Sequence, residues 1–152
     1  MKSEPADCSI DDLADAPGQT VAWVGVRNYQ ARNFMRDAMQ PGDGVLFYHS
    51  SCAEPGVAGL ATVAGSATPD DTQFDPSSPY FDPKASPDAP RWLHVTVKFA
   101  AKTRLLSLRE MRQRSELATM LLLKPGSRLS ITPVTAAEWA AVNTLLHLLP
   151  RQ

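Results

Sequence analysis

The sequence WVGVRNYQARN, residues 23–33, contains the densest cluster of polar side chains in the chain. The stretch 20–26 is rich in β-branched and aromatic residues, which favours an extended strand. Asn28 is a good helix N-cap, and the apolar side chains after it follow the spacing of a helix over 29–39. We therefore expect the chain to pass from strand to helix within this block, where free backbone N–H groups are exposed.

The side chains of this block suit recognition of a polar heterocycle. Asn, Gln and Arg groups present donors and acceptors that match the edges of a base, and a helix start adds a positive dipole end. Trp23 and Tyr48 provide flat surfaces on which a base could stack. The residues alone leave a second interpretation open: Asn28 is only a cap, Arg32 and Arg36 form a solvated helix face, and Trp23 belongs to the core.

The remaining chain predicts one α+β domain over residues 1–152, built around a small curled sheet. Its strands are expected at 20–26, 44–50, 57–66, 92–99 and 128–131. Helical segments are expected at 10–16, 29–39, around 108–111, at 117–121, and from a capping box at 135–138 to the C-terminus.

Residues 69–90, which we call the flap, form the longest stretch without a helix or strand pattern. Six of the thirteen prolines occur here together with five aspartates, which excludes regular helix or strand pairing over most of it. Loops of this length are often functional. Phe74, Tyr80 and Phe81 are apolar anchors, so we expect the flap to be ordered.

The composition is that of a soluble globular protein, with 43% hydrophobic and 20% charged residues. No apolar run is long enough for a membrane helix, and no export signal is present. We expect a cytoplasmic monomer whose Cys8 and Cys52 are reduced thiols. The net charge is −1, with acidic residues concentrated in 1–90 and basic residues in 91–152. This balance argues against a strongly basic nucleic-acid binder.

Two other clusters could carry chemistry. Lys2 beside Ser3 and Glu4 could form a nucleophile with an acid or base, but neighbouring residues on a strand point to opposite faces. His49 with Cys52 could suggest a metal, yet zinc needs three or four ligands and the other candidates lie at unsuitable spacings. The common cofactor and phosphate-binding motifs are absent. We expect no metal and no cofactor.

Eight segments match, in order, those of a known family. They are MKSEP (1–5), SIDDL (9–13), WVGVRNYQARNFMRD (23–37), PGDGVLFYHSSC (41–52), GLATV (59–63), FDPSSPYFDPKA (74–85), PRW (90–92) and RLSITPVT (128–135). The sequence resembles the EVE family of PUA-like domains. The resemblance implies a small PUA-like β-barrel (pseudo-barrel) with flanking helices and a non-catalytic pocket for a modified base flipped out of DNA or RNA.

The resemblance also implies a set of site residues. The ligand-binding positions are Lys2, Ser3, Trp23, Val26, Arg27, Asn28, Gln30, Tyr48, His49, Ser50, Arg128 and Ser130. We expect the base to enter between Trp23 and the Tyr48 side. We expect the phosphates to meet Arg27, Arg32, Arg91 and Arg104, with an affinity that falls as salt rises.

Two other functions remain open at this point. Related PUA-like barrels can host amide hydrolysis on acylated bases, in which case Lys2 would act with Ser3 or Glu4. Alternatively, the flap is a contact surface for another protein and the pocket stays empty.

Overall fold

The computed structural model describes residues 1–126 and 129–147. Five strands form one sheet in the order β1-β3-β4-β7-β2, and β5 pairs with β6. The strands are β1 (Lys2–Ser3), β2 (Thr20–Ala22), β3 (Gly44–His49), β4 (Gly56–Val63), β5 (Thr68–Pro69), β6 (Leu93–His94) and β7 (Thr96–Ser107). The α-helices are α1 (Ile10–Asp15), α2 (Tyr29–Asp37), α3 (Leu108–Arg112) and α4 (Ala136–His147). Short 3-10 turns are η1 (Pro17–Gln19), η2 (Asp71–Phe74), η3 (Ser115–Leu117) and η4 (Leu121–Leu123).

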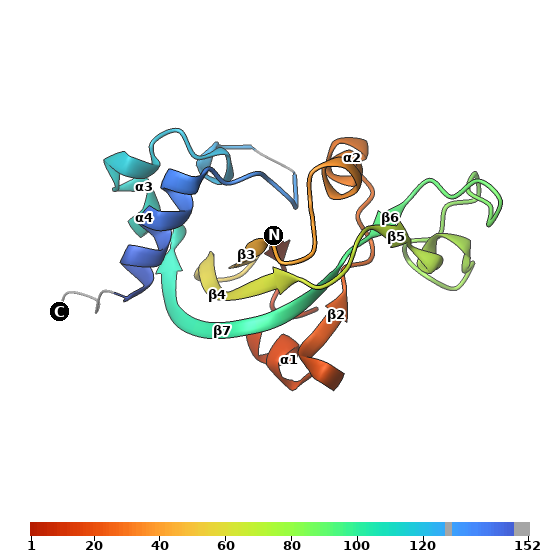
Figure 1. The fold of residues 1–152 in the computed structure, drawn as a ribbon, viewed down its shortest axis with the longest axis horizontal. Coiled ribbons are helices and arrows are strands. Elements are labelled where there is room, and N and C mark those ends of the chain that lie inside the picture. Colours follow the sequence, from red (N-terminus) through yellow and green to blue (C-terminus); the bar gives the residue numbers. More distant parts are fainter. Residues whose placement is uncertain (127–128, 148–152) are drawn as a thin grey trace.

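The long strand β7 gives the sheet its curl. It sweeps under the molecule from β6 to α3, as Figure 1 shows, and pairs with β4 and with β2. The register between β4 and β7 shifts at two places, between Val57 and Gly59 and between Leu60 and Ala61. Such irregularities bend a strand and increase its twist. The result is a half-barrel with helices around it, which confirms the predicted PUA-like α+β fold.

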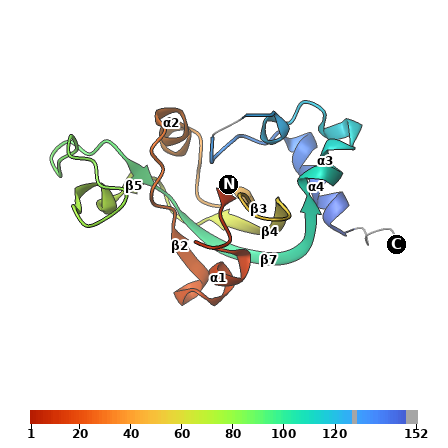
Figure 2. The ribbon, with the colours of Figure 1, turned by 180° about the vertical axis from the view of Figure 1, so that it is seen from behind.

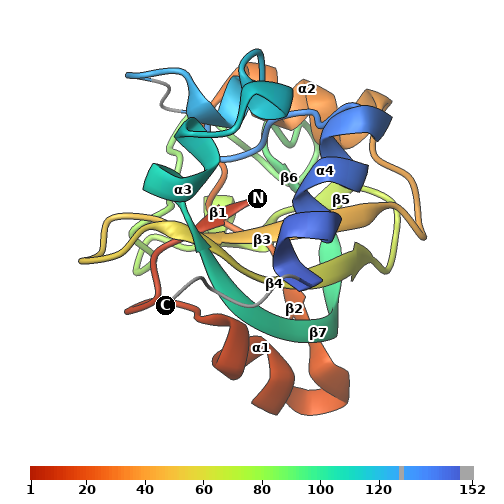
Figure 3. The ribbon, with the colours of Figure 1, turned by 90° about the vertical axis from the view of Figure 1, so that its left-hand side faces the viewer.

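The two faces of the curled sheet bury two separate cores. Along β3, Val45 and Phe47 belong to the first core, while Leu46 and Tyr48 belong to the second, as the alternation of a strand requires. Helix α1 packs against β7 and β2 beside the first core (Figure 2). Helices α3 and α4 stand over the other end of the sheet, where they cover the second core (Figure 3).

The helix starts were predicted well, because capping side chains mark them. Ser9 and Asp12 form the expected capping box of α1, and Thr135 and Glu138 form that of α4. Asn28 caps α2 through its side-chain oxygen, which accepts from the N–H of Ala31. The pairing of β3 with β4 is also confirmed.

Several predicted elements differ from those of the structure. The strand at 20–26 ends at Ala22, so the chain from 23 to 28 is irregular. The strand predicted at 92–99 is divided into β6 and β7, and β7 extends to Ser107. The helix predicted at 117–121 is absent, since Leu117 ends η3 and Leu121 begins η4. Of the predicted strand 128–131, Arg128 lies outside the described residues. Residues 129–131 do not form a strand. In the described ranges no helix is long and apolar enough to cross a membrane.

Candidate functional site

A cavity of about 720 Å³ opens between β1, the irregular segment after β2, the β3–β4 loop and the flap. This volume is typical of small-molecule sites. Its lining residues are Lys2, Ser3, Glu4, Asp7, Cys8, Val21, Ala22, Trp23, Val24, Gly25, Val26, Ser50, Ser51, Tyr80 and Ser130. Strand β1 runs parallel to β3, and the N–H of Lys2 donates to the Ser130 carbonyl at 2.8 Å, which joins three distant segments at the cavity.

Trp23 serves both the core and the cavity. Its side chain is 9% exposed and belongs to the first core, where its ring meets Phe47 edge-to-face at 5.6 Å between centroids. The same residue lines the cavity. The structure confirms that Trp23 belongs to the core, and the core fixes the position of the aromatic surface that lines the cavity.

Tyr80 brings the flap to the cavity. Gly25 has a φ of 87°, and a Cβ built on it would lie 2.6 Å from the Tyr80 ring. The ring therefore lies directly on the Gly25 backbone, a contact that only glycine permits. Tyr80 lines the cavity and remains 38% exposed, so it presents an aromatic surface at the edge of the site.

Arg27 holds the flap residue Tyr80 next to the segment that contains Gly25. Its guanidinium donates five hydrogen bonds, which matches its five N–H groups. Two go to the Tyr80 carbonyl, at 3.1 and 2.7 Å, and one goes to the Asp70 carboxylate at 3.0 Å. The others go to the Val26 carbonyl and to the Thr72 hydroxyl. Arg27 thus binds the flap to the segment that forms the cavity wall.

Asp70 is the buried anion at the centre of this network, with no exposed side-chain surface. Its carboxylate accepts from the Gly25 N–H at 2.9 Å, from Arg27, and from both the N–H and the hydroxyl of Thr72. Burial acts to raise the pKa of Asp70, but the hydrogen bonds from Thr72, Gly25 and Arg27 outweigh it and hold the pKa below 3.8. The carboxylate is therefore ionised when the cavity wall is in place.

Gln73 completes the base of the flap. Its buried amide donates to the carbonyls of Asp70 and Trp92 and accepts from the N–H groups of Arg91 and Trp92. One side chain thereby ties η2 to the chain that leads into β6. This confirms that the flap is ordered at its base, although polar groups rather than the expected aromatic anchors do most of the fastening.

The structure divides the predicted ligand-binding residues into two groups. The cavity is lined by Lys2, Ser3, Trp23, Val26, Ser50 and Ser130. Arg27, Asn28, Gln30, Tyr48 and His49 lie outside it. Arg128 is outside the described residues.

The residues outside the cavity have other contacts. Asn28 caps α2, and Gln30 is exposed on that helix. Tyr48 is 4% exposed in the second core, so the base cannot enter against it as expected; burial also raises its pKa. His49 accepts the N–H of Ile10 on Nε2 at 3.1 Å, which places it beneath α1.

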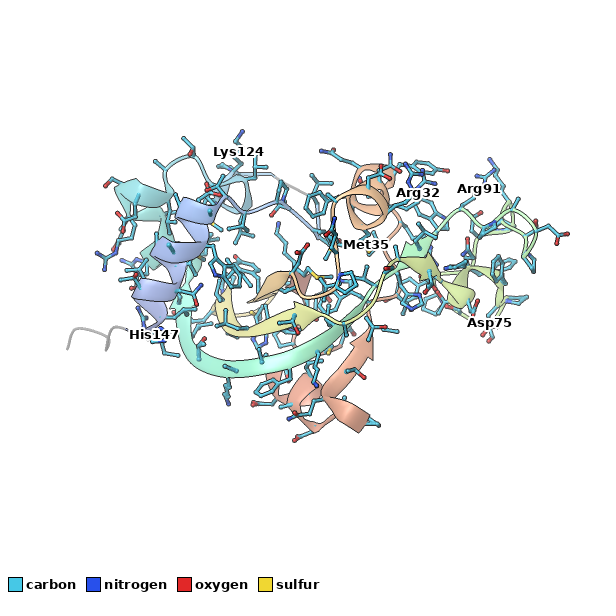
Figure 4. The ribbon with its side chains drawn as sticks, viewed as in Figure 1. Arg32, Met35, Asp75, Arg91, Lys124 and His147 are labelled. Atoms are coloured by element: carbon cyan, nitrogen blue, oxygen red, sulfur yellow. The ribbon has the colours of Figure 1, made fainter. Side chains whose placement is uncertain are left out.

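The guanidinium groups of Arg27 and Arg104, two of the predicted phosphate contacts, donate all their N–H groups within the protein. Arg104 also donates five hydrogen bonds, to Glu110 and to the carbonyls of Leu105 and Leu145. Arg32 donates to Asn33 and to the Arg91 carbonyl, and it lies over the Tyr29 ring. Figure 4 shows Arg32 and Arg91 near each other, where α2 approaches the flap.

Sequence reasoning missed several cavity residues, above all Tyr80 and Gly25. Tyr80 was recognised as apolar, and its segment was among the matching ones, but nothing in the pattern showed that the flap would fold back onto residue 25. Cys8 and Asp7 were also missed. They reach the cavity because the chain turns between β1 and α1, where the N–H groups of both residues donate to the Glu4 carbonyl.

A second cavity of about 570 Å³ lies between α2, η4 and the start of α4. It shares Lys2 and Ser130 with the first cavity, and Trp139 and Phe34 supply aromatic lining. Of the ligand-binding residues predicted from sequence, only the two shared ones line it among those described. The 720 Å³ cavity is therefore the better candidate site.

Comparison with known proteins identifies the family of this chain. The family model described as EVE domain matches residues 1–145. The chain belongs to the EVE domain family. Human thymocyte nuclear protein 1 is 42% identical over 162 residues, which cover 95% of this chain and 72% of that relative.

Solved structures of other proteins agree with this membership of the EVE family. Human THYN1 protein, solved in complex with DNA containing 5-methylcytosine, has a TM-score of 0.93 at 41% identity and covers 99% of this chain and 97% of that one. A protein from Pseudomonas putida has a TM-score of 0.91 at 46% identity, covering 95% and 96%. The EVE fold of this chain is thus shared with both a human and a bacterial relative.

Proposed function

We propose that this EVE domain is a non-catalytic reader that holds a modified base of DNA in the 720 Å³ cavity. The observation that carries the proposal is the similarity to the human THYN1 protein, which is in complex with DNA containing 5-methylcytosine. The cavity supports it, because six of the residues that the family resemblance implied line one space of ligand size. The base reaches this space by leaving the helical stack.

Aromatic surfaces offset the cost of removing the base from its stack. Flipping costs a few kcal/mol, and stacking on an aromatic side chain contributes about 1–3 kcal/mol per base. Trp23 is held by the first core, while Tyr80 is held by Gly25 and Arg27. Both surfaces are in place before a ligand arrives, so little ordering cost is added on binding.

The phosphates lie near Arg32 and Arg91 in this proposal. These residues stand where α2 approaches the flap, and the flap also supplies Tyr80. The net charge of −1 gives little general attraction for a polyanion. Binding therefore depends on the base pocket, while a few phosphate contacts make it weaken with salt.

The geometry around Lys2 and Ser3 favours binding over amide hydrolysis. Ser3 donates its hydroxyl proton to the Cys8 carbonyl at 2.6 Å, and a carbonyl is too weak a base to activate a nucleophile. Burial lowers the pKa of Lys2, but the two residues are successive positions on β1. Release of product from N4-acylated deoxycytidine, abolished by Lys2→Ala, would contradict the non-catalytic proposal.

Fluorescence anisotropy with labelled DNA tests the proposal. Duplexes of one sequence carry either 5-methylcytosine or cytosine at one position, and matching RNA forms a further arm. We expect tighter binding to the modified DNA and a loss of about 10-fold in Tyr80→Ala, because one stacking surface is removed. Phe81→Ala is the matched control, since Phe81 is the next flap residue, is 39% exposed, and does not line the cavity. Equal, negligible binding to every oligonucleotide would refute the proposal.

A further inference from the structure

A groove of about 390 Å³ lies where the loop between β3 and β4 meets α3. Its lining residues are Glu54, Pro55, Leu108, Arg109, Arg112 and Gln113. Both arginines are exposed, and together they outweigh the single carboxylate of the groove. The lining of the candidate cavity has the opposite balance, because Lys2 faces two carboxylates, those of Glu4 and Asp7. A polyanion is therefore attracted to the groove rather than to the cavity.

The guanidinium groups of the groove retain donors for a ligand. Arg112 donates one hydrogen bond, at 3.3 Å to the Leu123 carbonyl, and Arg109 forms no hydrogen bond or ion pair with the described part of the chain. A guanidinium has five N–H groups, and their fork matches the oxygens of a phosphate. The two arginines are three positions apart on α3, so they lie on the same face of the helix.

One short loop connects the groove to the cavity. Ser50 and Ser51, at its start, line the cavity, whereas Glu54 and Pro55, at its end, line the groove. A fully extended chain from residue 50 to residue 55 spans at most about 18 Å. One DNA strand carries a phosphate about every 3.4 Å along the helix axis. The groove is therefore within the length of about five nucleotides of a base held in the cavity.

Both ends of this loop are fixed by backbone hydrogen bonds. The N–H of Ser50 donates to the Ser3 carbonyl on β1, and the N–H of Leu108 donates to the Pro55 carbonyl, each at 2.9 Å. The Ser107 hydroxyl also caps α3, so the start of the helix is held independently of Arg104. Figure 3 shows the β3–β4 loop and α3 on one side of the molecule and α4 on the other. The groove thus keeps a defined position relative to the cavity.

We infer that Arg109 and Arg112 bind phosphates of the same DNA whose modified base occupies the cavity. The inference rests on the proposed function and adds a second backbone contact to the one proposed at Arg32 and Arg91. Figure 1 shows α3 and the flap at opposite ends of the molecule, so the two contacts hold the DNA on both sides of the cavity. Phosphate contacts position a duplex without reading its sequence.

The salt dependence of binding tests this inference. Anisotropy titrations with the 5-methylcytosine duplex between about 50 and 200 mM salt give the slope of log K against log salt concentration. We expect Arg109→Gln and Arg112→Gln each to reduce the steepness of this slope by about 0.9, the value of one phosphate contact. Each variant should weaken binding of the 5-methylcytosine and cytosine duplexes by the same factor, because the lost contact does not read the base.

Two further variants control for general charge effects. Lys98→Gln is the matched control, since it also removes one exposed cation, on β7 and outside the groove, and it should leave the slope and the affinity unchanged. Glu54→Gln removes the carboxylate of the groove and should tighten binding of both duplexes at low salt. Circular dichroism verifies folding. All four positions are exposed, and if an arginine variant does not fold, Glu54→Gln still decides the inference.

The outcomes separate this inference from the function on which it rests. Wild-type slopes and affinities in the folded groove variants overturn the inference but leave a base reader. A loss of affinity confined to the modified duplex also overturns it, because the arginines then act on the base cavity. Binding of neither duplex by the wild-type protein refutes the proposed function, and the inference with it.

Discussion

Arg27 and Arg104 fasten opposite ends of the curled sheet with the same chemistry. Each guanidinium donates five hydrogen bonds, to one carboxylate and to several backbone carbonyls or hydroxyls. Arg27 joins the flap to the cavity wall. Arg104 joins β7 to α3 through Glu110 and to α4 through the Leu145 carbonyl. Arg27 supports the candidate site, whereas Arg104 supports the packing of the helices on the sheet.

The difference lies in the partner carboxylates. Asp70 is fully buried and also accepts the N–H of Gly25, so its ion pair with Arg27 supports the wall itself. Glu110 is 29% exposed and does not line the candidate cavity. The same side-chain type therefore serves the site at one end and only the fold at the other. Substitutions of the two arginines at these ends should therefore differ in their effect on DNA binding.

Arg27→Ala should have the largest effect. Removing the cation leaves Asp70 as an uncompensated buried charge, which typically costs about 3–5 kcal/mol. We expect the free energy of unfolding in urea to fall by that amount, and the flap to release Tyr80. DNA binding should then be lost under conditions where the protein is still folded. Full binding by a folded Arg27→Ala protein would show that the wall does not need this ion pair.

Arg104→Ala is the counterpart at the helical end. Its carboxylate partner Glu110 is 29% exposed, so water replaces some of the lost hydrogen bonds, and we expect a smaller loss of about 1–3 kcal/mol. Dissociation constants for the modified DNA, measured well below the melting temperature, should equal those of the wild-type protein. A drop in affinity comparable to that of Arg27→Ala would erase the distinction between the two ends.

Gly25→Ala tests the wall without removing a charge. A residue with a side chain is strained at this φ of 87°, at a cost of about 1–3 kcal/mol, and its Cβ would collide with the Tyr80 ring. Gly42→Ala is a close control, because Gly42 has a φ of 92° and open space around its Cβ position. Both variants should lose stability in urea through the strained φ, Gly25→Ala more because of the collision, but only Gly25→Ala should lose affinity for DNA. Matching affinities would mean that the position of Tyr80 is unimportant.

The sequence predicted local features of the fold but not the long-range contacts of the two arginines. The helix starts could be predicted, because a capping side chain bonds to a backbone N–H only three residues away. Ser9, Asn28 and Thr135 mark these starts. Of the block 23–33, which matches the family, only residues 23–26 line the cavity. The five-bond environments of Arg27 and Arg104 could not be read, because their partners lie up to 53 residues away along the chain.

The failures at Tyr48 and Tyr80 have the same origin. On β3, alternation places Tyr48 on the face of Leu46, but the sequence does not say which face meets the cavity. Tyr80 lies in a segment without periodicity, so its position depends on the contacts with Gly25, Arg27 and the flap base. Pattern reasoning reaches the elements of a fold, whereas contacts between distant irregular segments complete the site.

The smallest predicted effect is a dependence of stability on pH that belongs to the cavity end. Burial lowers the pKa of His49 below 6.5; Asp11 and Asp12 oppose this shift, and Lys102 adds to it. Nε2 accepts the Ile10 N–H, so protonation there removes the acceptor. Because the unfolded chain binds the proton more readily, His49 contributes stability that is complete above pH 6.5 and is lost as the pH falls from there through the lowered pKa of the folded protein.

The helical end responds only at lower pH. The hydrogen bonds and charge of Arg104 hold the pKa of Glu110 below 4.5 despite partial burial, so the contribution of Glu110 is complete above that value and is lost as the pH falls further. Urea titrations between pH 7 and pH 5 should therefore show a decline that His49→Gln reduces, because glutamine offers an acceptor that does not titrate in this range. His147→Gln, on the exposed end of α4, should leave the decline unchanged. If stability declines equally with pH in His49→Gln and in the wild-type protein, other groups cause the pH dependence. The two ends of the sheet would then not differ between pH 7 and pH 5.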